Sequence, residues 1–160
     1  DVEANDEETV KANWEQLKLK EGKKSVLEGV PKGLPSLVKA YRMQDKVRGV
    51  GFDWDNEHQV WDKVEEELAE FKAELDVDAE RATDEFGDVL FALVNFARFK
   101  DINPDEALER TNRRFRNRFQ HMENEIRKAG GKSLAEMTLA EMDVHWNAAK
   151  KALAKDEKRP

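Results

Sequence analysis

The chain has 160 residues, a length that suits one domain with a single hydrophobic core. It contains no cysteine, which excludes disulfides and thiolate metal sites, and its formal net charge of −7 argues against general nucleic-acid binding. Hydrophobic and charged residues each make up 39%, and only four prolines and eight glycines interrupt the chain, so long amphipathic helices are favoured over a many-turned β fold.

The first residues are strongly charged and contain few apolar side chains. Asn5 with Glu8 can form a capping box for a short helix that ends by Gly22. We therefore expect a linker or domain-joining helix at 1–25, a helical domain at 26–155 and a tail at 156–160. Because the chain does not begin with Met, we expect it to be processed or excised from a longer protein. No apolar run or signal peptide indicates a membrane, so a cytoplasmic location is expected.

Two amphipathic helices are predicted next. The first should end near Gly49, which leaves the sequence GVGFDW as a connecting loop. The second should run from about residue 57 to residue 75. Apolar residues recur at helical spacing along one face of each helix, namely Leu37, Val38, Tyr41 and Val47 in the first and Val60, Val64, Leu68, Phe71 and Leu75 in the second.

A third helix is predicted from about residue 78 to residue 99. After Asp88 it reads VLFALVNFARF and is apolar on nearly every side, so it should be the most buried helix. Asn103 and Pro104 should start a fourth helix that extends to Gly130. Its inward-facing residues are predicted to be Leu108, Phe115, Phe119, Met122 and Ile126.

Thr138 and Glu141 form a capping box that should open a last helix. This helix carries Met142, Trp146 and Leu153 on its apolar side. The connections between all these helices are short. The predicted fold is therefore an all-α antiparallel helix bundle.

The second predicted helix contains a run of glutamates, which is usually a solvated face. At about 100° per residue, however, Glu67 falls at the edge of the apolar stripe. Glu70 lies outward on the same side, whereas Glu65 and Glu66 point elsewhere. A carboxylate beside the core is costly without a partner, so this position indicates a functional role.

The third helix has a similar feature. Glu85 and Asp88 are three residues apart and share a face, on which Asn95 lies two turns later. An acid-rich first helical turn that favours the macrodipole is the alternative interpretation. Gly87 between the two acids costs about 1 kcal/mol of helix propensity relative to alanine, which indicates close approach of another group to the backbone.

Antiparallel packing of the second and third helices would bring these four carboxylates together. They would keep their protons unless a cation compensated their charge. An all-oxygen site suits Mg²⁺, with Mn²⁺ as a plausible substitute. Zinc is a poor fit because His58, His121 and His145 lie far apart in the sequence.

The fourth helix supplies the opposite charge in the sequence ERTNRRFRNRF. Arg114 and Arg118 flank its apolar stripe beside Asn112. This is either a solvated basic face or a phosphate-binding face, to which Lys63 and Arg81 can add. Nucleic acid is the rival ligand, but the net charge disfavours stable binding.

Taken together, these motifs resemble the MazG nucleotide pyrophosphohydrolases. Glu66-Glu67-Leu-Ala-Glu70, followed after fourteen residues by Glu85-Phe-Gly-Asp88, matches the EExxE…ExxD pattern of that family. The surrounding segments LPSLVKAYRMQDKVRGVGFDW, WDKVEEELAE, EFGDVLFALVNFAR and NRRFRNRF match as well, so the resemblance covers about residues 26–150. The chain looks like the C-terminal domain of a tandem-domain MazG protein.

The resemblance implies hydrolysis of a nucleoside triphosphate to monophosphate and pyrophosphate with Mg²⁺, in a homodimer of MazG-like helical domains. A role in nucleotide pool sanitation or stress-related nucleotide control is expected. Glu66, Glu67 and Glu70 are the catalytic candidates, with Glu66 orienting water or supporting the metal ligands. The implied metal ligands are Glu67, Glu70, Glu85 and Asp88. The candidate substrate-binding residues are Lys63, Arg81, Asn95, Asn112, Arg114, Arg118 and Trp146, of which Trp146 either stacks on the base or belongs to the core.

Two other functions stay open at this point. The chain could be a non-catalytic helical module that senses nucleotides or binds a partner. It could also be a basic-helix nucleic-acid binder, which predicts steeply salt-dependent binding. Release of pyrophosphate from triphosphates distinguishes the enzyme from both.

Overall fold

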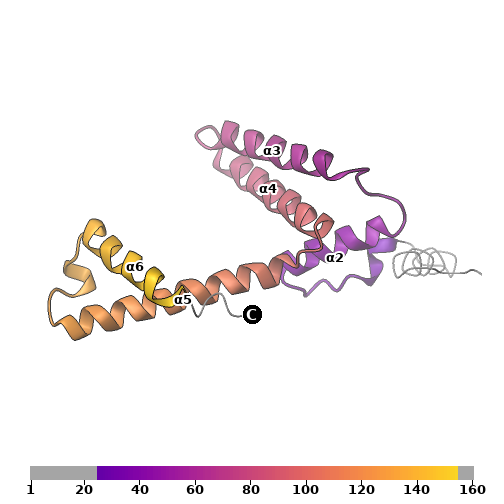
Figure 1. The fold of residues 1–160 in the computed structure, drawn as a ribbon. Coiled ribbons are helices and arrows are strands. Elements are labelled where there is room, and N and C mark those ends of the chain that lie inside the picture. The colour runs from indigo at the N-terminus through magenta and orange to yellow at the C-terminus, as the bar shows by residue number, and fades with distance from the viewer. Residues whose placement is uncertain (1–24, 155–160) are drawn as a thin grey trace, which may run out of the picture. The chain divides into compact units, whose positions relative to one another are not determined.

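A computed structural model describes residues 25–154 of the chain. These residues form five α-helices and two short 3₁₀ helices, and no strand occurs among them. The predicted all-α class is thus confirmed for this part of the chain. The helix predicted between Asn5 and Gly22 and the predicted tail at 156–160 lie outside the described residues. The elements are η1 (Val26–Gly29), α2 (Ser36–Arg48), α3 (Glu57–Glu74), α4 (Ala79–Phe99), α5 (Pro104–Ala129), η2 (Leu134–Glu136) and α6 (Leu139–Leu153) (Figure 1).

The chain divides into two compact units, of which the first ends at Asp105 and the second begins at Glu106. The first contains η1, α2, α3 and α4, and the second contains most of α5 together with η2 and α6. The domain boundaries expected from the sequence therefore stay a prediction. The packing of all helices into a single bundle also stays a prediction.

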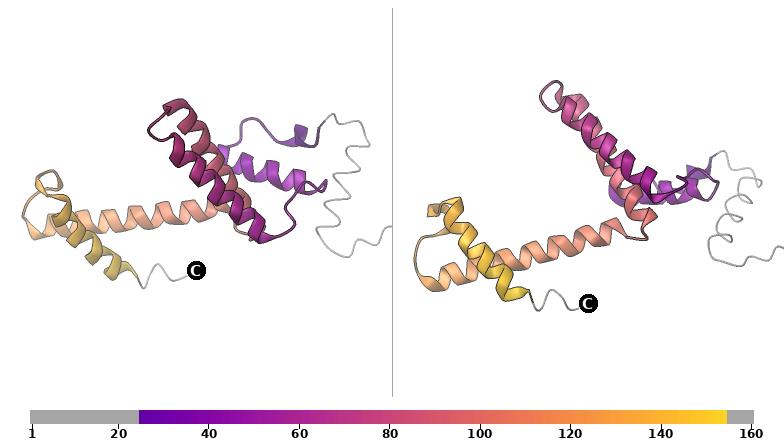
Figure 2. Two further views of the ribbon diagram at one scale, coloured as in Figure 1. Left: turned by 90° about the horizontal axis from the view of Figure 1, so that it is seen from above. Right: turned by 45° about the horizontal axis from the view of Figure 1, so that its top comes forward.

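In the first unit, α3 and α4 run side by side as an antiparallel hairpin, and α2 packs against α4 (Figure 2). Both hairpin helices begin with a side-chain cap. The Asn56 side chain accepts a hydrogen bond from the Gln59 N–H at 3.1 Å, and the Asp78 side chain accepts from the N–H groups of Glu80 and Arg81. The core of the hairpin consists of Val60 and Val64 from α3 and Val89, Ala92 and Val94 from α4.

The loop between α2 and α3 is the predicted GVGFDW connection. It leaves α2 at Gly49 and turns at Gly51, whose φ of +87° falls in the left-handed region that favours glycine. The Phe52 N–H then donates to the Val47 carbonyl oxygen at 3.0 Å. The next residue, Asp53, forms an ion pair with Arg98 of α4, which fixes the loop against that helix.

The second unit contains a smaller core. Met122 and Ile126 of α5 and Ala149 of α6 are buried, and Trp146 is among the partly buried side chains packed against them. The predicted capping box of Thr138 and Glu141 is present at the start of α6. The predicted start of α5 is also confirmed, because the Asp105 N–H donates to the Asn103 side chain at 3.1 Å.

Several predicted core positions are wrong, and they share a physical cause. Leu68 and Leu75 of α3, and Leu108 and Phe115 of α5, lie on apolar stripes but are exposed. In α4, which was predicted to be the most buried helix, Leu90, Phe91 and Leu93 are more than 40% exposed. Within the described residues, α4 packs mainly against α3 and, over a smaller area, against α2, and these contacts leave part of its apolar surface exposed.

Candidate metal and nucleotide site

The α3 helix presents Glu67 on its buried face. Residues at i, i+4 and i+7 share one side of a helix, so Glu67 follows Val60 and Val64 into the core and is only 7% exposed. A buried carboxylate needs a compensating charge or hydrogen bonds. The position at the edge of the core that the sequence predicted for Glu67 is thereby confirmed.

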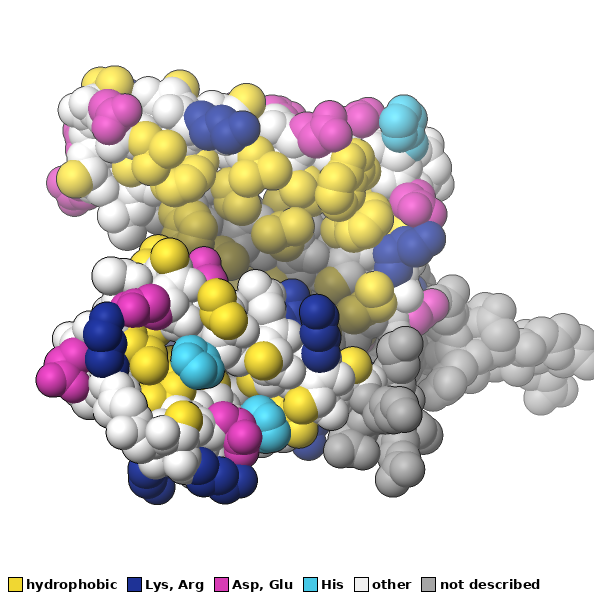
Figure 3. All heavy atoms as spheres, turned by 60° about the vertical axis from the view of Figure 1, so that its left-hand side comes forward, with side chains coloured by type: hydrophobic (Ala, Val, Ile, Leu, Met, Phe, Trp, Pro, Cys, Tyr) yellow, Lys and Arg dark blue, Asp and Glu magenta, His cyan; other side chains and the backbone are white. Residues whose placement is uncertain are grey.

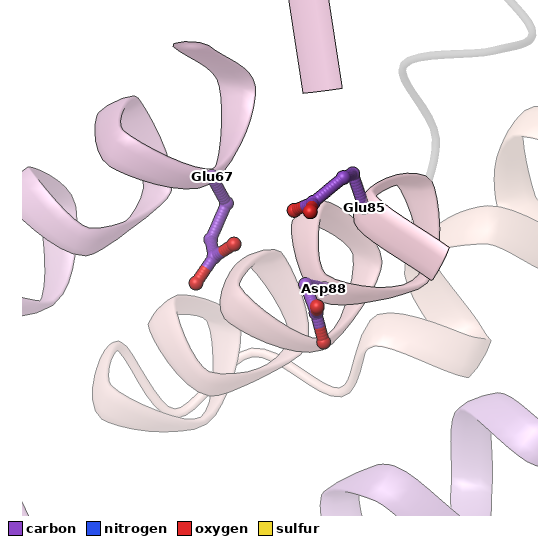
Figure 4. A group of neighbouring side chains, drawn as sticks. All are labelled: Glu67, Glu85 and Asp88. Atoms are coloured by element: carbon purple, nitrogen blue, oxygen red, sulfur yellow. The ribbon is translucent and has the colours of Figure 1, made fainter. Parts of the chain in front are cut away.

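The α4 helix places Glu85 and Asp88 opposite Glu67. One carboxylate oxygen from each of the three residues lies within 4.8 Å of the others. Figure 4 shows the Glu67 side chain directed from α3 toward the two acids of α4. In the part of the chain that the structure describes, this is the one such group of acidic, histidine or cysteine side chains.

The fourth predicted ligand, Glu70, acts on the same cluster. The pKa of Glu85 is raised above its ordinary value, first by partial burial and then by the negative charges of Glu70, Asp88 and Glu67, while Arg81 opposes the shift. Glu70 therefore lies close enough to repel Glu85. The negative charges of Glu70, Asp88 and Glu67 therefore all act on the Glu85 carboxylate.

Lys63 supplies the nearest positive charge. Its Nζ lies 2.7 Å from Glu67 Oε1 and 3.0 Å from Glu66 Oε1, one turn further along α3. The hydrogen bond to Glu67, followed by that to Glu66, raises the pKa of Lys63 above its ordinary value. One ammonium group thus compensates the buried carboxylate and fixes Glu66 beside it.

The donor set fits a hard divalent cation. Carboxylate oxygens on two adjacent helices, in a cluster that is partly open to solvent, match the oxygen ligands and retained waters that Mg²⁺ prefers. A cation at this position would also offset the neighbouring negative charges that, after partial burial, raise the pKa of Glu85. The assignment of all four residues as metal ligands stays a prediction.

Arg81 and Asn95 of the first unit, which were predicted to bind the substrate, differ in their surroundings. Arg81 is 63% exposed at its side chain and forms an ion pair with Glu74 at 2.7 Å. Asn95 is half-buried on α4, where its Oδ1 accepts hydrogen bonds from Arg98 Nε and Nη2 at 3.1 and 2.9 Å. Arg81 is therefore the more exposed of these two candidates for substrate contact.

The remaining candidates belong to the second unit. Arg114 donates to the Thr111 hydroxyl at 2.9 Å, and Asn112 contacts Glu109 at 3.4 Å. The Trp146 ring packs against Phe115 with centroids 5.3 Å apart and is half-buried in the core of this unit. These residues belong to the second unit, whereas the acidic cluster belongs to the first. It therefore stays a prediction that the cluster is approached by Asn112, Arg114, Arg118 and Trp146.

The sequence interpretation of Gly87 is not supported in the described part of the chain. A Cβ atom added at this position would meet no described atom within 4 Å. Gly87 therefore accommodates no close neighbour within residues 25–154. The presence of a glycine inside this helix therefore has no explanation among the described neighbours, and the Gly87→Ala substitution tests whether another group lies there.

Three polar residues near the site were missed. Gln44 of α2 and Arg98 of α4 are, within residues 25–154, the other buried polar side chains besides Glu67, and Asp53 pairs with Arg98 across 45 residues. Arg98 interrupts an otherwise apolar segment, which is the one local signal that could have revealed it. The periodicity of α2 gave no such signal for Gln44.

The acidic cluster on two paired helices of an all-α domain has the donor set of a metal site. Known proteins with similar sequences are nucleotide pyrophosphohydrolases. The chain is 39% identical over 140 residues to the nucleoside triphosphate pyrophosphohydrolase/pyrophosphatase MazG of Thermotoga maritima, and 35% identical over 158 residues to the nucleoside triphosphate pyrophosphohydrolase of Escherichia coli K12. These matches cover 86% and 94% of the chain. Over most of its length the chain is therefore similar to the MazG nucleoside triphosphate pyrophosphohydrolases.

The matches cover only part of each relative. The chain spans 54% of the Thermotoga protein and 60% of the Escherichia protein. An uncharacterised Bacillus subtilis protein, YabN, is 47% identical over 160 residues, which is 32% of its length. No protein-family model matches the chain. None of the described helices combines the length and the hydropathy needed to cross a membrane.

Proposed function

We propose that the chain hydrolyses nucleoside triphosphates to nucleoside monophosphates and pyrophosphate with Mg²⁺. The observation that carries this proposal is the convergence of Glu67, Glu85 and Asp88 within 4.8 Å, in a chain whose relatives are named for this reaction. Sanitation of the nucleotide pool or stress-related nucleotide control is the proposed biological role.

Glu67, Glu85 and Asp88, together with Glu70, would hold the metal. When bound, Mg²⁺ polarises phosphoryl oxygens and neutralises the charge of the pyrophosphate leaving group. Mn²⁺ offers the same oxygen-ligand chemistry and is the proposed substitute. The buried position of Glu67 restricts its side chain and so helps to fix its carboxylate in place.

Lys63 and Glu66 act beside the metal ligands. The Lys63 ammonium is held at the boundary of the cluster by two carboxylates, where it can contact a phosphate oxygen. Glu66 is exposed and anchored at 3.0 Å by Lys63, so its free carboxylate oxygen can orient a water molecule for attack on the α-phosphorus. Arg81, Asn112, Arg114 and Arg118 are the proposed further contacts to the triphosphate.

We propose a homodimer as the assembly. Hydrophobic side chains gather along the α3–α4 hairpin (Figure 3). Leu68 of α3 and Phe86, Leu90 and Leu93 of α4 are each exposed by more than a third. An apolar surface of this kind is typical of an association site. A second copy of the same hairpin would cover it.

Product analysis tests the reaction. The chain is incubated with Mg²⁺ and a mixture of nucleoside triphosphates, and the products are separated by anion-exchange chromatography. Equal amounts of monophosphate and pyrophosphate are expected. Formation of diphosphate and orthophosphate, or no turnover with any triphosphate, would overturn the proposed reaction.

A further inference from the structure

The α3–α4 hairpin carries matched charged positions on its two helices. These positions are Glu67, Glu70 and Glu74 on α3, at spacings of three and four, and Arg81, Glu85 and Asp88 on α4, at spacings of four and three. Because the helices are antiparallel, the pattern on α4 is the pattern on α3 in reverse order. The hairpin therefore has an acidic cluster, followed toward its turn by a level at which Glu74 faces Arg81.

The pair of Glu74 and Arg81 is asymmetric. Arg81 Nη2 lies 2.7 Å from Glu74 Oε1, and the Glu74 side chain is only 14% exposed, whereas that of Arg81 is mostly in solvent. The second carboxylate oxygen, Glu74 Oε2, is buried and has no hydrogen-bond partner among the described residues. One contact thus joins a largely buried carboxylate to an exposed guanidinium group.

Stability alone is a weak explanation for this pair. Removing a carboxylate from water costs free energy, which one ion pair with an exposed partner offsets only in part. The unpaired Glu74 Oε2 adds to that cost. Arg81 also lies in the first turn of α4, where the helix dipole disfavours a positive charge. The effect of the pair on its surroundings is therefore the better explanation.

Glu85 is an alternative partner for Arg81. The two residues are four apart on α4, a spacing at which oppositely charged side chains come into contact. Burial and the neighbouring acids raise the pKa of Glu85, and the charge of Arg81 opposes them, so the guanidinium group is close enough to act on this carboxylate. An Arg81 side chain released from Glu74 would therefore pair with Glu85.

A pair between Arg81 and Glu85 would interfere with the acidic cluster. Glu85 contributes one of the three carboxylate oxygens that lie within 4.8 Å of one another. A guanidinium group on this carboxylate would compete with a cation for the oxygen atoms and would repel the cation through its own charge. The position of Arg81 therefore matters for every ion that the cluster binds.

We propose that Glu74 is a positioning residue that holds Arg81 beside the acidic cluster and away from Glu85. Glu85 then stays available to a divalent cation, and the other N–H groups of the Arg81 side chain stay available to a phosphate oxygen of the substrate. This inference rests on the proposed function, since it concerns the same metal site. Without Glu74, the same arginine would act as an internal competitor of the metal.

Binding of Mn²⁺ alone, without nucleotide, tests the proposal on the full chain. Electron paramagnetic resonance measures the free ion and so gives the dissociation constant. Glu74→Gln should weaken Mn²⁺ binding by about tenfold, because Arg81 then pairs with Glu85. Glu80→Gln is the matched control, since it removes the same charge from an exposed neighbour of Arg81, and it should change the dissociation constant by less than about twofold.

Arg81→Gln separates this effect from the simple loss of a charge. Glutamine keeps an N–H that can donate to Glu74, but it carries no charge that competes for Glu85. Adding Glu74→Gln to this variant should weaken Mn²⁺ binding by less than about twofold. Equal factors in the parent and in the Arg81→Gln background, whatever their size, would overturn the proposal.

The Arg81→Gln variant is also a test by itself. It should bind Mn²⁺ within about threefold of the parent, because Arg81 is already held away from Glu85 in the parent. A gain of about tenfold would mean that Arg81 competes with the ion despite Glu74, and it would overturn the proposal even if no Glu74 variant folds. Helical circular dichroism establishes which variants are folded.

Pyrophosphate release, measured separately, distinguishes this inference from the proposed function. In Glu74→Gln, the Mg²⁺ concentration at half-maximal rate should rise by about tenfold, and excess Mg²⁺ should restore most of the rate. A purely structural role of Glu74 predicts a loss that excess ion does not restore, which would overturn the inference. A parent that binds Mn²⁺ without releasing pyrophosphate would overturn the reaction alone, whereas a parent that binds no Mn²⁺ would overturn the metal site and this inference together.

Discussion

At the scale of single residues, the acidic cluster depends on charge compensation. Glu67 is buried, and the Lys63 ammonium at 2.7 Å is its nearest compensating charge. A divalent cation bound by the same carboxylates would perform the same compensation. Lys63 and the metal are therefore linked in their effects on stability.

Replacing Lys63 with methionine tests this linkage. Without Mg²⁺ the change should lower the free energy of unfolding by about 1–2 kcal/mol, because a buried carboxylate loses its partner at a site that solvent partly screens. With saturating Mg²⁺ the loss should become smaller. Thermal unfolding with and without the ion measures both values, and Lys72→Met on the exposed face of α3 is the control. Equal losses in the two conditions would contradict the linkage.

The site residues differ in how well the sequence revealed them. Glu67 was recognisable because a charged residue at the edge of an apolar stripe is a local anomaly. Gln44 and Arg98 were not, since their partners lie 47 and 45 residues away and depend on how α2 and the following loop pack against α4. Polar contacts that join distant segments leave no periodic signal in either segment.

At the scale of elements, helix ends were predictable and helix faces were only partly so. The predicted ends of α3 and α4 agree with Glu57–Glu74 and Ala79–Phe99 to within one residue. Capping side chains such as Asn56 and Asp78 act within one turn, so sequence alone specifies them. Burial of a face depends on the neighbouring element, and for this reason Leu68 is exposed despite its place on the apolar stripe, and α4 is less buried than predicted.

The Gly87→Ala substitution tests what lies beside α4. Because no described atom is within 4 Å of the added Cβ, alanine should raise the free energy of unfolding by up to about 1 kcal/mol. Chemical denaturation measures the change. Gly51→Ala is the opposite control, since its φ of +87° is strained for alanine and the change should destabilise. A destabilised Gly87→Ala variant would mean that another group approaches this helix.

The α6 capping box predicts a pH dependence of stability. A hydrogen bond from Lys132 and a second from the Thr138 backbone lower the pKa of Glu141 to about 2 from its ordinary value of 4.5. Because the folded pKa is depressed, this contribution is fully present above pH 4.5 and is lost as the pH falls toward 2. Glu141→Gln should flatten the stability profile in that range, measured by urea unfolding. Asp143→Asn on the same helix should leave the profile unchanged.

At the scale of the whole molecule, the proposed assembly is a homodimer formed through the α3–α4 hairpin. Light scattering after size exclusion should give twice the mass of the chain. Leu90→Glu should weaken association by at least about tenfold, since it places a charge on the apolar surface that the second copy would cover. Val77→Glu, in the exposed turn between the two helices, is the matched control. A monomeric parent chain would contradict the assembly.

The central claim is that the carboxylate cluster of α3 and α4 holds the metal for pyrophosphate release. Its most direct measurement is the Mg²⁺-dependent rate of pyrophosphate release by Glu67→Gln and by Glu65→Gln, whose side chain instead accepts a hydrogen bond from Trp61 at 2.8 Å. Glu67→Gln should lose more than about 100-fold in rate with helical circular dichroism retained, because an oxygen ligand loses its charge. Glu65→Gln should keep the parent rate. Equal rates for the two variants would contradict the claim.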